Sequence, residues 1–215
     1  MNNLIPADIG PSKFATKEAL KTVTKVGDYL PRIQLMSSSS DIVKEGKFPM
    51  GHYALIKGKE NYLDLTQEFI CLILSWRPKA MQFQPDVISS YNPSSDLFKD
   101  IEERSKKPQS GCGYGPEFLL WLPEQVELVT YFMGNVTGRN EATNVMALCP
   151  SNGKNGVCVF GSHLIKSKKG TWHGPQVRPY NQEINLPDWA LVKPEIEKFN
   201  NPSESEIEVA EQTGR

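Results

Sequence analysis

Long apolar runs are missing from this chain of 215 residues. No stretch approaches the ~18 consecutive apolar residues that a membrane-spanning helix requires. The segment Met1–Pro6 also lacks the basic start and the long apolar centre of a secretory signal peptide. We therefore expect no membrane partner and a location in the cytoplasm, which is the host cytoplasm if the protein is viral.

Cysteine and histidine are scarce and widely spaced. The chain has four cysteines and three histidines, which are Cys71, Cys112, Cys149, Cys158, His52, His163 and His173. No two of them form the close C-x-x-C or H-x-x-x-H pair with which zinc sites begin. The sequence therefore predicts four free thiols, no metal site and no cofactor.

Catalytic signatures are missing as well. The chain contains no G-x-S-x-G elbow, no H-E-x-x-H helix, no Walker loop and no dinucleotide glycine fingerprint. The glycine-rich segment Gly111–Pro116 is the nearest approach to a phosphate-binding loop, although a tight turn that enters a strand at Glu117 is the favoured interpretation. We expect a protein that is not an enzyme, and an enzyme that uses this loop ranks last among the alternatives.

Net charge is almost absent. Lysine and arginine number 24 against 25 aspartates and glutamates, which gives a formal charge of -1 and a sequence pI near 6.3. A molecule so balanced generates no overall field that draws it onto nucleic acid or an anionic membrane. Binding that is driven by charge must therefore be local.

Most of the predicted β-structure lies between residues 52 and 178. The segments His52–Lys57 and Phe69–Trp76 are rich in aliphatic and aromatic side chains, as strands are. Phe69–Trp76 is apolar almost throughout, so we expect a central strand that is covered on both faces and ends at Arg77–Lys79. The following residues 106–116 are predicted to form a loop.

Turn residues divide the rest of this region into hairpins and short helices. The two expected hairpins have arms at 117–122 and 126–133 and at 157–167 and 171–178. A helix that begins at Pro123 is the competing interpretation of the first hairpin. Ser94 or Ser95 caps an amphipathic helix that ends near Arg104. The predicted class is therefore α+β and β-rich, with a few short helices.

Both ends of the chain differ from this domain of residues 51–181. Residues 1–50 are predicted to form an N-terminal arm, with a short helix over Ser12–Val26, that packs on the domain. Residues 182–215 are interrupted by prolines and end in an acidic stretch, with Pro187, Pro194, Pro202, Glu204, Glu206, Glu208 and Glu211. We expect a disordered acidic tail, because so little apolar surface does not offset the entropy of the chain.

The strongest local signal is electrostatic. Between Lys154 and Arg178 the chain carries five cations and no aspartate or glutamate, and three aromatic residues, Phe160, Trp172 and Tyr180, lie within or just beyond this stretch. Cations that neutralise phosphates, interleaved with aromatic faces that stack on bases, are typical of proteins that hold single strands without reading their sequence. Trp76–Lys79 repeats the combination.

A simpler interpretation of the same residues is also open. Lysines at the tip of a hairpin keep it soluble and discourage pairing with other strands, and the aromatic residues then belong to the core. The function that matches this interpretation is a non-enzymatic structural or assembly protein of a virus or phage, which acts through protein contacts.

The β-rich middle, the basic aromatic hairpin Leu164–Pro175 and the acidic tail together resemble the single-stranded-DNA-binding proteins of tailed bacteriophages. The likeness covers residues 50–180 and the tail. It implies an OB-like antiparallel barrel or sandwich and sequence-independent binding of single-stranded DNA in DNA replication or recombination. The tail here ends in Arg215, whereas the tails of those phage proteins often end in an aromatic residue.

The resemblance also implies which residues meet the strand. Trp76 and Trp172 are the candidate stacking platforms. The candidate phosphate contacts are Arg77, Lys79, Lys166, Lys168, Lys169 and Arg178. Single-stranded nucleic acid is then the main partner, replication proteins are candidate partners of the acidic tail, and a homo-oligomer is compatible with the sequence.

Overall fold

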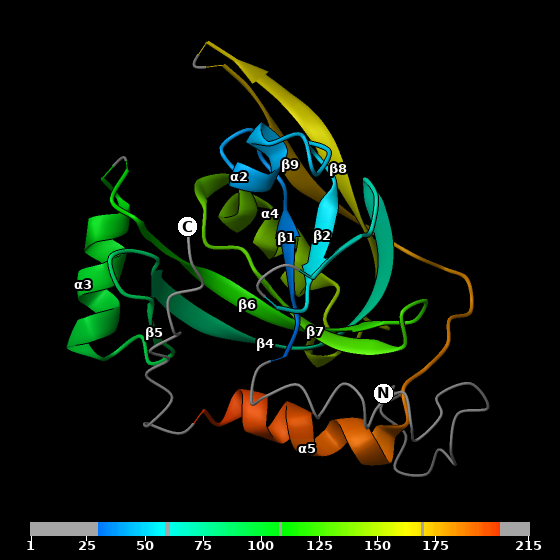
Figure 1. Ribbon diagram of the computed structural model, residues 1–215. Coiled ribbons are helices and arrows are strands. Elements are labelled where there is room, and N and C mark those ends of the chain that lie inside the picture. The colour runs from blue at the N-terminus through cyan, green and yellow to red at the C-terminus, as the bar shows by residue number, and fades with distance from the viewer. Residues whose placement is uncertain (1–29, 59–60, 108, 169, 203–215) are drawn as a thin grey trace.

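The computed structural model describes residues 30–58, 61–107, 109–168 and 170–202 (Figure 1). Within this part of the chain a nine-stranded, mostly antiparallel sheet combines with α-helices, which confirms the predicted α+β, β-rich class. The strands are β1 (Arg32–Leu35), β2 (Tyr53–Ile56), β3 (Tyr62–Asp64), β4 (Glu68–Gln82), β5 (Ile88–Ser90), β6 (Cys112–Leu122), β7 (Glu127–Phe132), β8 (Val157–Ser167) and β9 (Gly170–Pro179).

Helices connect and cover the strands. They are α2 (Asp41–Lys44), α3 (Asp96–Ser105), α4 (Val136–Ala147), α5 (Trp189–Asn200) and the short 3₁₀ helix η1 (Pro150–Asn152). The predicted amphipathic helix is confirmed as α3, where the Ser95 hydroxyl caps the helix by accepting a hydrogen bond from the Phe98 N–H at 3.2 Å. Phe98 and Ile101 are its buried residues, so α3 presents a narrow apolar stripe to the sheet.

The strand order is β3-β2-β1-β7-β6-β4-β8-β9, and β5 pairs with the second half of β4. Both predicted hairpins are confirmed as β6–β7 and β8–β9. β1 runs antiparallel to β2 and parallel to β7, so a segment from the predicted N-terminal arm lies inside the sheet. The pairing path among the described strands ends at β3 and at β9, and the sheet is therefore open.

The sheet curls strongly although its pairing stays open. The hydroxyl of Tyr53 on β2 donates to the Gly161 carbonyl of β8 at 2.8 Å, and four strands separate β2 from β8 in the pairing order. A flat sheet would hold these strands about 24 Å apart at ~4.8 Å per neighbour. The main core fills the curl: the Tyr53 ring meets Phe69 at 4.9 Å, and Val145 of α4 packs in the same cluster.

The predicted central strand is confirmed in β4. Phe69, Cys71 and Ile73 point into the core inside the curl, while Leu72 and Leu74 belong to a second apolar cluster beneath α5. This alternation explains the continuous apolar run, because both faces of the strand are covered.

Two boundaries in this region were predicted wrongly. β4 continues past Trp76 to Gln82, and β6 begins at Cys112 inside the predicted loop. Pro78 lies directly opposite Pro116. Since neither proline can donate a hydrogen bond, they form a non-hydrogen-bonded pair, which an antiparallel ladder accommodates.

The predicted disorder after residue 182 is also wrong over α5. Asp188 caps this helix by accepting a hydrogen bond from the Ala190 N–H at 3.0 Å, and Trp189, Val192 and Phe199 are buried against the sheet. Three large apolar side chains at helical spacing bury enough surface to stabilise this helix. The prolines of the segment had led to the prediction of disorder. The acidic residues after Pro202, the predicted helix over Ser12–Val26 and Lys169 lie outside the described residues.

Candidate nucleic-acid interface

Strands β8 and β9 form a long hairpin whose outer half leaves the sheet. β8 pairs with β4 from Val157 to Gly161, and among the described residues it then pairs with β9 alone, as far as Ser167 opposite Gly170. We call residues 162–168 and 170–175 the arm. At ~3.3 Å per residue it extends roughly 20 Å beyond the last pair with β4, and Figure 1 shows it projecting from the molecule.

The arm is held by contacts with helix α4 and with the turn before β2. Ser162 Oγ lies 3.1 Å from His173 Nδ1, and the His173 ring packs so closely on Gly51 that no Cβ fits there. The indole N–H of Trp172 donates to Thr137 Oγ1 of α4 at 3.2 Å. A two-stranded ribbon alone is marginally stable in water, so these contacts stabilise the arm.

The edge of β9 is also covered where the arm meets the sheet. The Val177 N–H donates to the Glu141 carboxylate of α4 at 2.7 Å. An unpaired edge N–H would invite pairing with another strand, and the carboxylate blocks that contact. The edge of β9 is therefore blocked at Val177, just below the arm.

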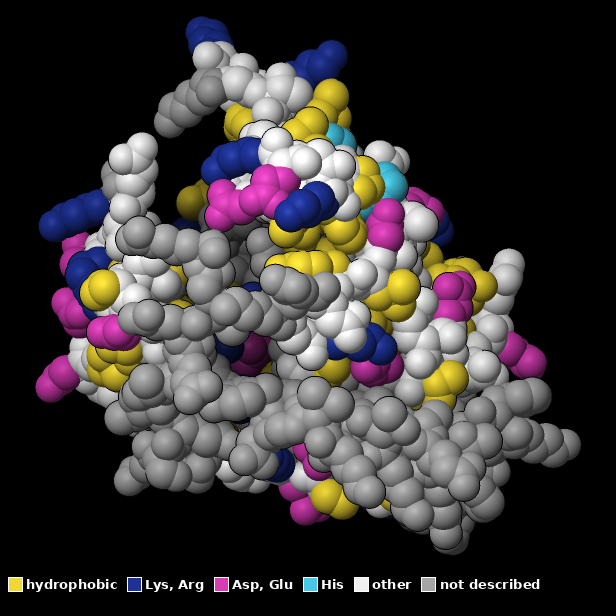
Figure 2. All heavy atoms as spheres, viewed as in Figure 1, with side chains coloured by type: hydrophobic (Ala, Val, Ile, Leu, Met, Phe, Trp, Pro, Cys, Tyr) yellow, Lys and Arg dark blue, Asp and Glu magenta, His cyan; other side chains and the backbone are white. Residues whose placement is uncertain are grey.

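The outer surface of the arm combines cations with apolar faces. Lys166 and Lys168 are exposed, and Leu164 and Trp172 keep 47% and 36% of their surface in solvent. Figure 2 shows lysine or arginine side chains at the end of the arm, with hydrophobic and histidine side chains below them. The chain has no carboxylate between Lys154 and Arg178, so the arm carries none.

The other predicted nucleic-acid-binding residues, Trp76, Arg77 and Lys79, lie away from the arm, and the two cations among them already have partners. Arg77 Nε donates to Glu117 Oε2 at 2.9 Å, and Lys79 Nζ donates to Glu117 Oε1 at 2.8 Å. The Arg77 guanidinium also stacks 3.7 Å from the centre of the Tyr91 ring, and Lys79 is only 7% exposed. Arg77 and Lys79 are thus placed in a buried ion cluster that is not open to a phosphate backbone.

Trp76 itself is 41% exposed on β4, but it is far from the arm. From the register of β4 with β8, Trp76 and Lys166 are separated by roughly 40 Å along the strands at ~3.3 Å per residue. Arg178 lies at the foot of the arm, where its guanidinium pairs with Glu68 at 3.0 Å. The arm therefore carries Lys166 and Lys168 on one face and Trp172, which lies opposite Ile165, on the other, and Arg178 lies at its foot.

Sequence reasoning missed the residues that position the arm. Gly51, Thr137 and Glu141 lie far from residues 162–175 in the sequence, and none belongs to a recognisable motif. Only the tertiary contacts show that they support Trp172, His173 and the edge of β9.

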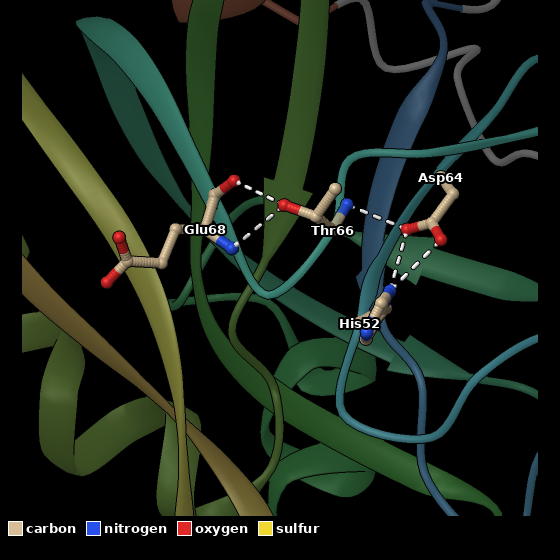
Figure 3. A network of polar contacts seen from close by, with 4 residues as sticks. All are labelled: His52, Asp64, Thr66 and Glu68. Carbon is tan, nitrogen blue, oxygen red and sulfur yellow. Dashed lines mark hydrogen bonds and ion pairs between the residues drawn. The ribbon is translucent and has the colours of Figure 1, made fainter.

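The polar groups near the arm do not form a catalytic relay. Ser162 contacts His173, but the carboxylate of Asp64 lies 3.0 Å from His52 Nδ1 and also accepts a hydrogen bond from the Thr66 N–H at 2.7 Å (Figure 3). A serine nucleophile requires one histidine that is oriented by a carboxylate, and these pairs are separate. In the described part of the chain, no group of three or more His, Cys, Asp or Glu side chains is placed to hold a metal ion.

The thiols are free, as predicted, and three of the four are buried. Cys71 Sγ lies 3.6 Å from Cys158 Sγ across β4 and β8. Burial in the apolar core raises the pKa of Cys71 well above its ordinary value and that of Cys149 to about 11. These thiols therefore stay protonated and behave as small apolar side chains.

Comparison with known proteins identifies no relative of this chain. No family model, curated protein or solved structure matches this chain. None of the helices in the described ranges combines the length and the apolar character that crossing a bilayer requires. The arm and its surroundings are therefore the basis for assigning a function.

Proposed function

We propose that this protein binds single-stranded nucleic acid without reading its sequence, in the DNA replication or recombination of a tailed bacteriophage. The observation that carries the proposal is the arm: a projecting ribbon with Lys166 and Lys168 at its end, an exposed Trp172 face and no carboxylate. Phosphates pair with the lysines, and a base stacks on the indole. No cofactor takes part.

The curled sheet supports the OB-like part of the proposal. Proteins of that fold hold single strands on one face and the loops of a small, partly open antiparallel barrel. Here the residues between β3 and β4 bridge the curl, because Thr66 accepts from the Tyr53 N–H of β2 at 2.8 Å while Gln67 accepts from the Ser162 N–H of β8 at 2.9 Å. We regard the sheet as an OB-like scaffold that presents the arm.

The hydrogen bond from Trp172 to Thr137 gives the stacking face a fixed orientation. A pre-oriented aromatic ring loses little conformational entropy when a base stacks on it. Charge contacts act differently, since each lysine that neutralises a phosphate releases condensed counterions. Measuring affinity at several salt concentrations therefore separates the stacking contribution from the charge contribution.

The test is a titration of labelled 12-nucleotide DNA and RNA strands at two or more salt concentrations. The slope of log K against log salt is expected to be about -0.7 for each phosphate neutralised. The variant K166E/K168E/K169E should flatten the slope. K99E/K106E/K107E is the matched control, because it reverses three exposed cations on and just after α3 and changes the net charge equally.

Trp172→Ala should weaken binding by about 1–3 kcal/mol with little change in the salt slope. Trp172→Phe keeps a ring but not the N–H, and it should retain most of the affinity. No affinity for any strand at low salt would contradict the proposal and favour an assembly protein that acts through protein contacts. Affinity that survives reversal of the arm lysines would place the interface elsewhere.

A further inference from the structure

The edge of β8 is open along the arm. β4 begins at Glu68 opposite Gly161, and just beyond it Gln67 accepts a hydrogen bond from the Ser162 N–H at 2.9 Å. Backbone groups of alternate residues point to the same side of an antiparallel strand, so those of Leu164 and Lys166 continue the edge that Ser162 begins. Among the described strands only β9 pairs with β8 beyond this point, which leaves the outer edge of residues 163–167 unpaired.

The edge of β9, on the other side of the hairpin, is protected near the foot of the arm. The Val177 N–H is bound by the Glu141 carboxylate at 2.7 Å, and the residues two positions away on either side are Pro175 and Pro179. Proline has no N–H to offer to another strand. The arm is therefore more accessible to a further strand along β8 than along the lower part of β9.

The length and the direction of the open edge fit a second copy of the chain. Ile165 is the midpoint of residues 163–167, and its own backbone groups face β9. If two copies run antiparallel with Ile165 opposite Ile165, Leu164 of each copy lies opposite Lys166 of the other, and the outward N–H and C=O groups of both residues are paired. A register centred on Lys166 would place two lysines face to face, which is destabilising. A register centred on Leu164 would collide with Gln67.

The side chains support the same pairing. Ile165 is half-buried and lies directly opposite Trp172 of β9. Residues in a non-hydrogen-bonded antiparallel pair have Cα atoms ~4.5 Å apart, so the two Ile165 side chains meet, and a row of four apolar side chains with Trp172 at each end crosses the joined sheet. At each end of the interface, Lys168 of one copy approaches Glu68 of the other, whose side chain is 57% exposed beside Arg178.

We propose that two copies of this protein associate through the outer edge of β8, about a twofold axis at Ile165. The product is a four-stranded antiparallel sheet in the order β9-β8-β8-β9, in which both copies use the same surface, as a twofold interface requires. This inference goes beyond the proposed function, because the strands pair without nucleic acid. Interfaces that bury less than ~1,200 Å² are weak, and a five-residue strand pair belongs to that class, so association should rise with protein concentration.

Disulfide cross-linking tests the register. Each variant carries Cys112→Ser, because Cys112 is the one cysteine that is not buried. Ile165→Cys should form a covalent dimer with oxidised glutathione, since its two Cα atoms lie within the ~4.4–6.8 Å that a disulfide spans. Lys166→Cys is the control at a more exposed neighbouring position, and it should stay largely monomeric because its two copies lie two residues out of register.

A mixture of two variants tests the same register independently. His163 and Ser167 are exposed and lie opposite each other across the proposed axis, so His163→Cys and Ser167→Cys should form a heterodimer when mixed. Either variant alone should form few dimers, because its cysteines lie four residues out of register. Equal cross-linking of Ile165→Cys and Lys166→Cys would overturn the proposal, and so would a mixture that cross-links no more than its components.

Sedimentation velocity measures association of the chain without introduced cysteines. Leu164→Lys places two lysines opposite each other twice in the dimer and should weaken association about tenfold. Gln176→Lys is the control of equal charge, because Gln176 is exposed on β9 below the arm. A wild-type chain that stays monomeric at its highest soluble concentration, or an equal loss in both variants, would contradict the interface. Nucleic acid is absent from these measurements, so their outcome is independent of the proposed function.

Discussion

Glu117 neutralises two cations at once and is only 3% exposed on β6. Glu117→Gln keeps its shape but removes the carboxylate from Arg77 and Lys79, where little water replaces it. Removing one partner of a buried ion pair costs about 3–5 kcal/mol. We therefore expect this variant to lower the free energy of unfolding by that amount in urea denaturation.

The matched control is Glu103→Gln, since Glu103 pairs with Lys106 at 2.6 Å on the exposed side of α3. Its urea midpoint should stay nearly unchanged, because exposed ion pairs contribute little. If the two variants unfolded at the same urea concentration, the buried cluster would not stabilise the fold as described.

The four thiols differ in their access to solvent. Cys112 is half-buried at the start of β6, whereas Cys71, Cys149 and Cys158 are buried, and burial raises the pKa of Cys71 and Cys149. A thiol reagent at pH 8 should therefore modify one cysteine quickly and three only on unfolding. Mass spectrometry of tryptic peptides identifies the fast site, and rapid labelling of Cys71 would contradict the core placement of β4.

At the scale of elements, β4 is the strand on which both apolar clusters depend. Leu72→Ala should lower the free energy of unfolding by about 2–5 kcal/mol, through lost burial and the cavity left behind. Leu164→Ala on the arm is the control, because Leu164 is largely exposed and its loss should leave the urea midpoint nearly unchanged. Equal effects at the two positions would show that β4 is not the centre of the sheet.

Helix α5 is the second element with a clear energetic role. A chain that ends after Asn201 keeps Trp189, Val192 and Phe199 on the sheet and should melt within a few degrees of the full chain. A chain that ends after Pro187 exposes the cluster around Leu72 and Trp121 and should melt many degrees lower. Thermal unfolding followed by circular dichroism measures both, and equal melting temperatures would contradict the packing of α5.

At the scale of the whole molecule, charge is distributed unevenly along the chain. Deleting residues 203–215 removes four glutamates and one arginine and changes the formal charge from -1 to +2. Binding of single strands should then tighten and speed up at low salt, because fewer negative charges oppose the approach of the phosphates. Stopped-flow anisotropy measures the association rate, and an unchanged rate would show that these residues do not compete for the arm.

Sequence patterns identified features that depend on neighbours along the chain. The central strand Phe69–Trp76, the β6–β7 and β8–β9 hairpins and the Ser95-capped helix all follow from local periodicity and turn residues. The predicted extents of strands and helices were wrong where a proline was taken to interrupt the element. Pro78 lies within β4, and Pro194 lies within α5, because packing over each element outweighs the local preference.

The sequence by itself determined that the arm is basic, aromatic and free of carboxylates, because these are properties of consecutive residues. Only the tertiary structure decided which cations are available. Glu117 forms ion pairs with both Arg77 and Lys79, although it lies about forty residues away in the sequence. In the described part of the chain, no carboxylate forms an ion pair with Lys166. The physical reason is that charge pairing depends on distance in space, which the curled sheet sets and composition does not.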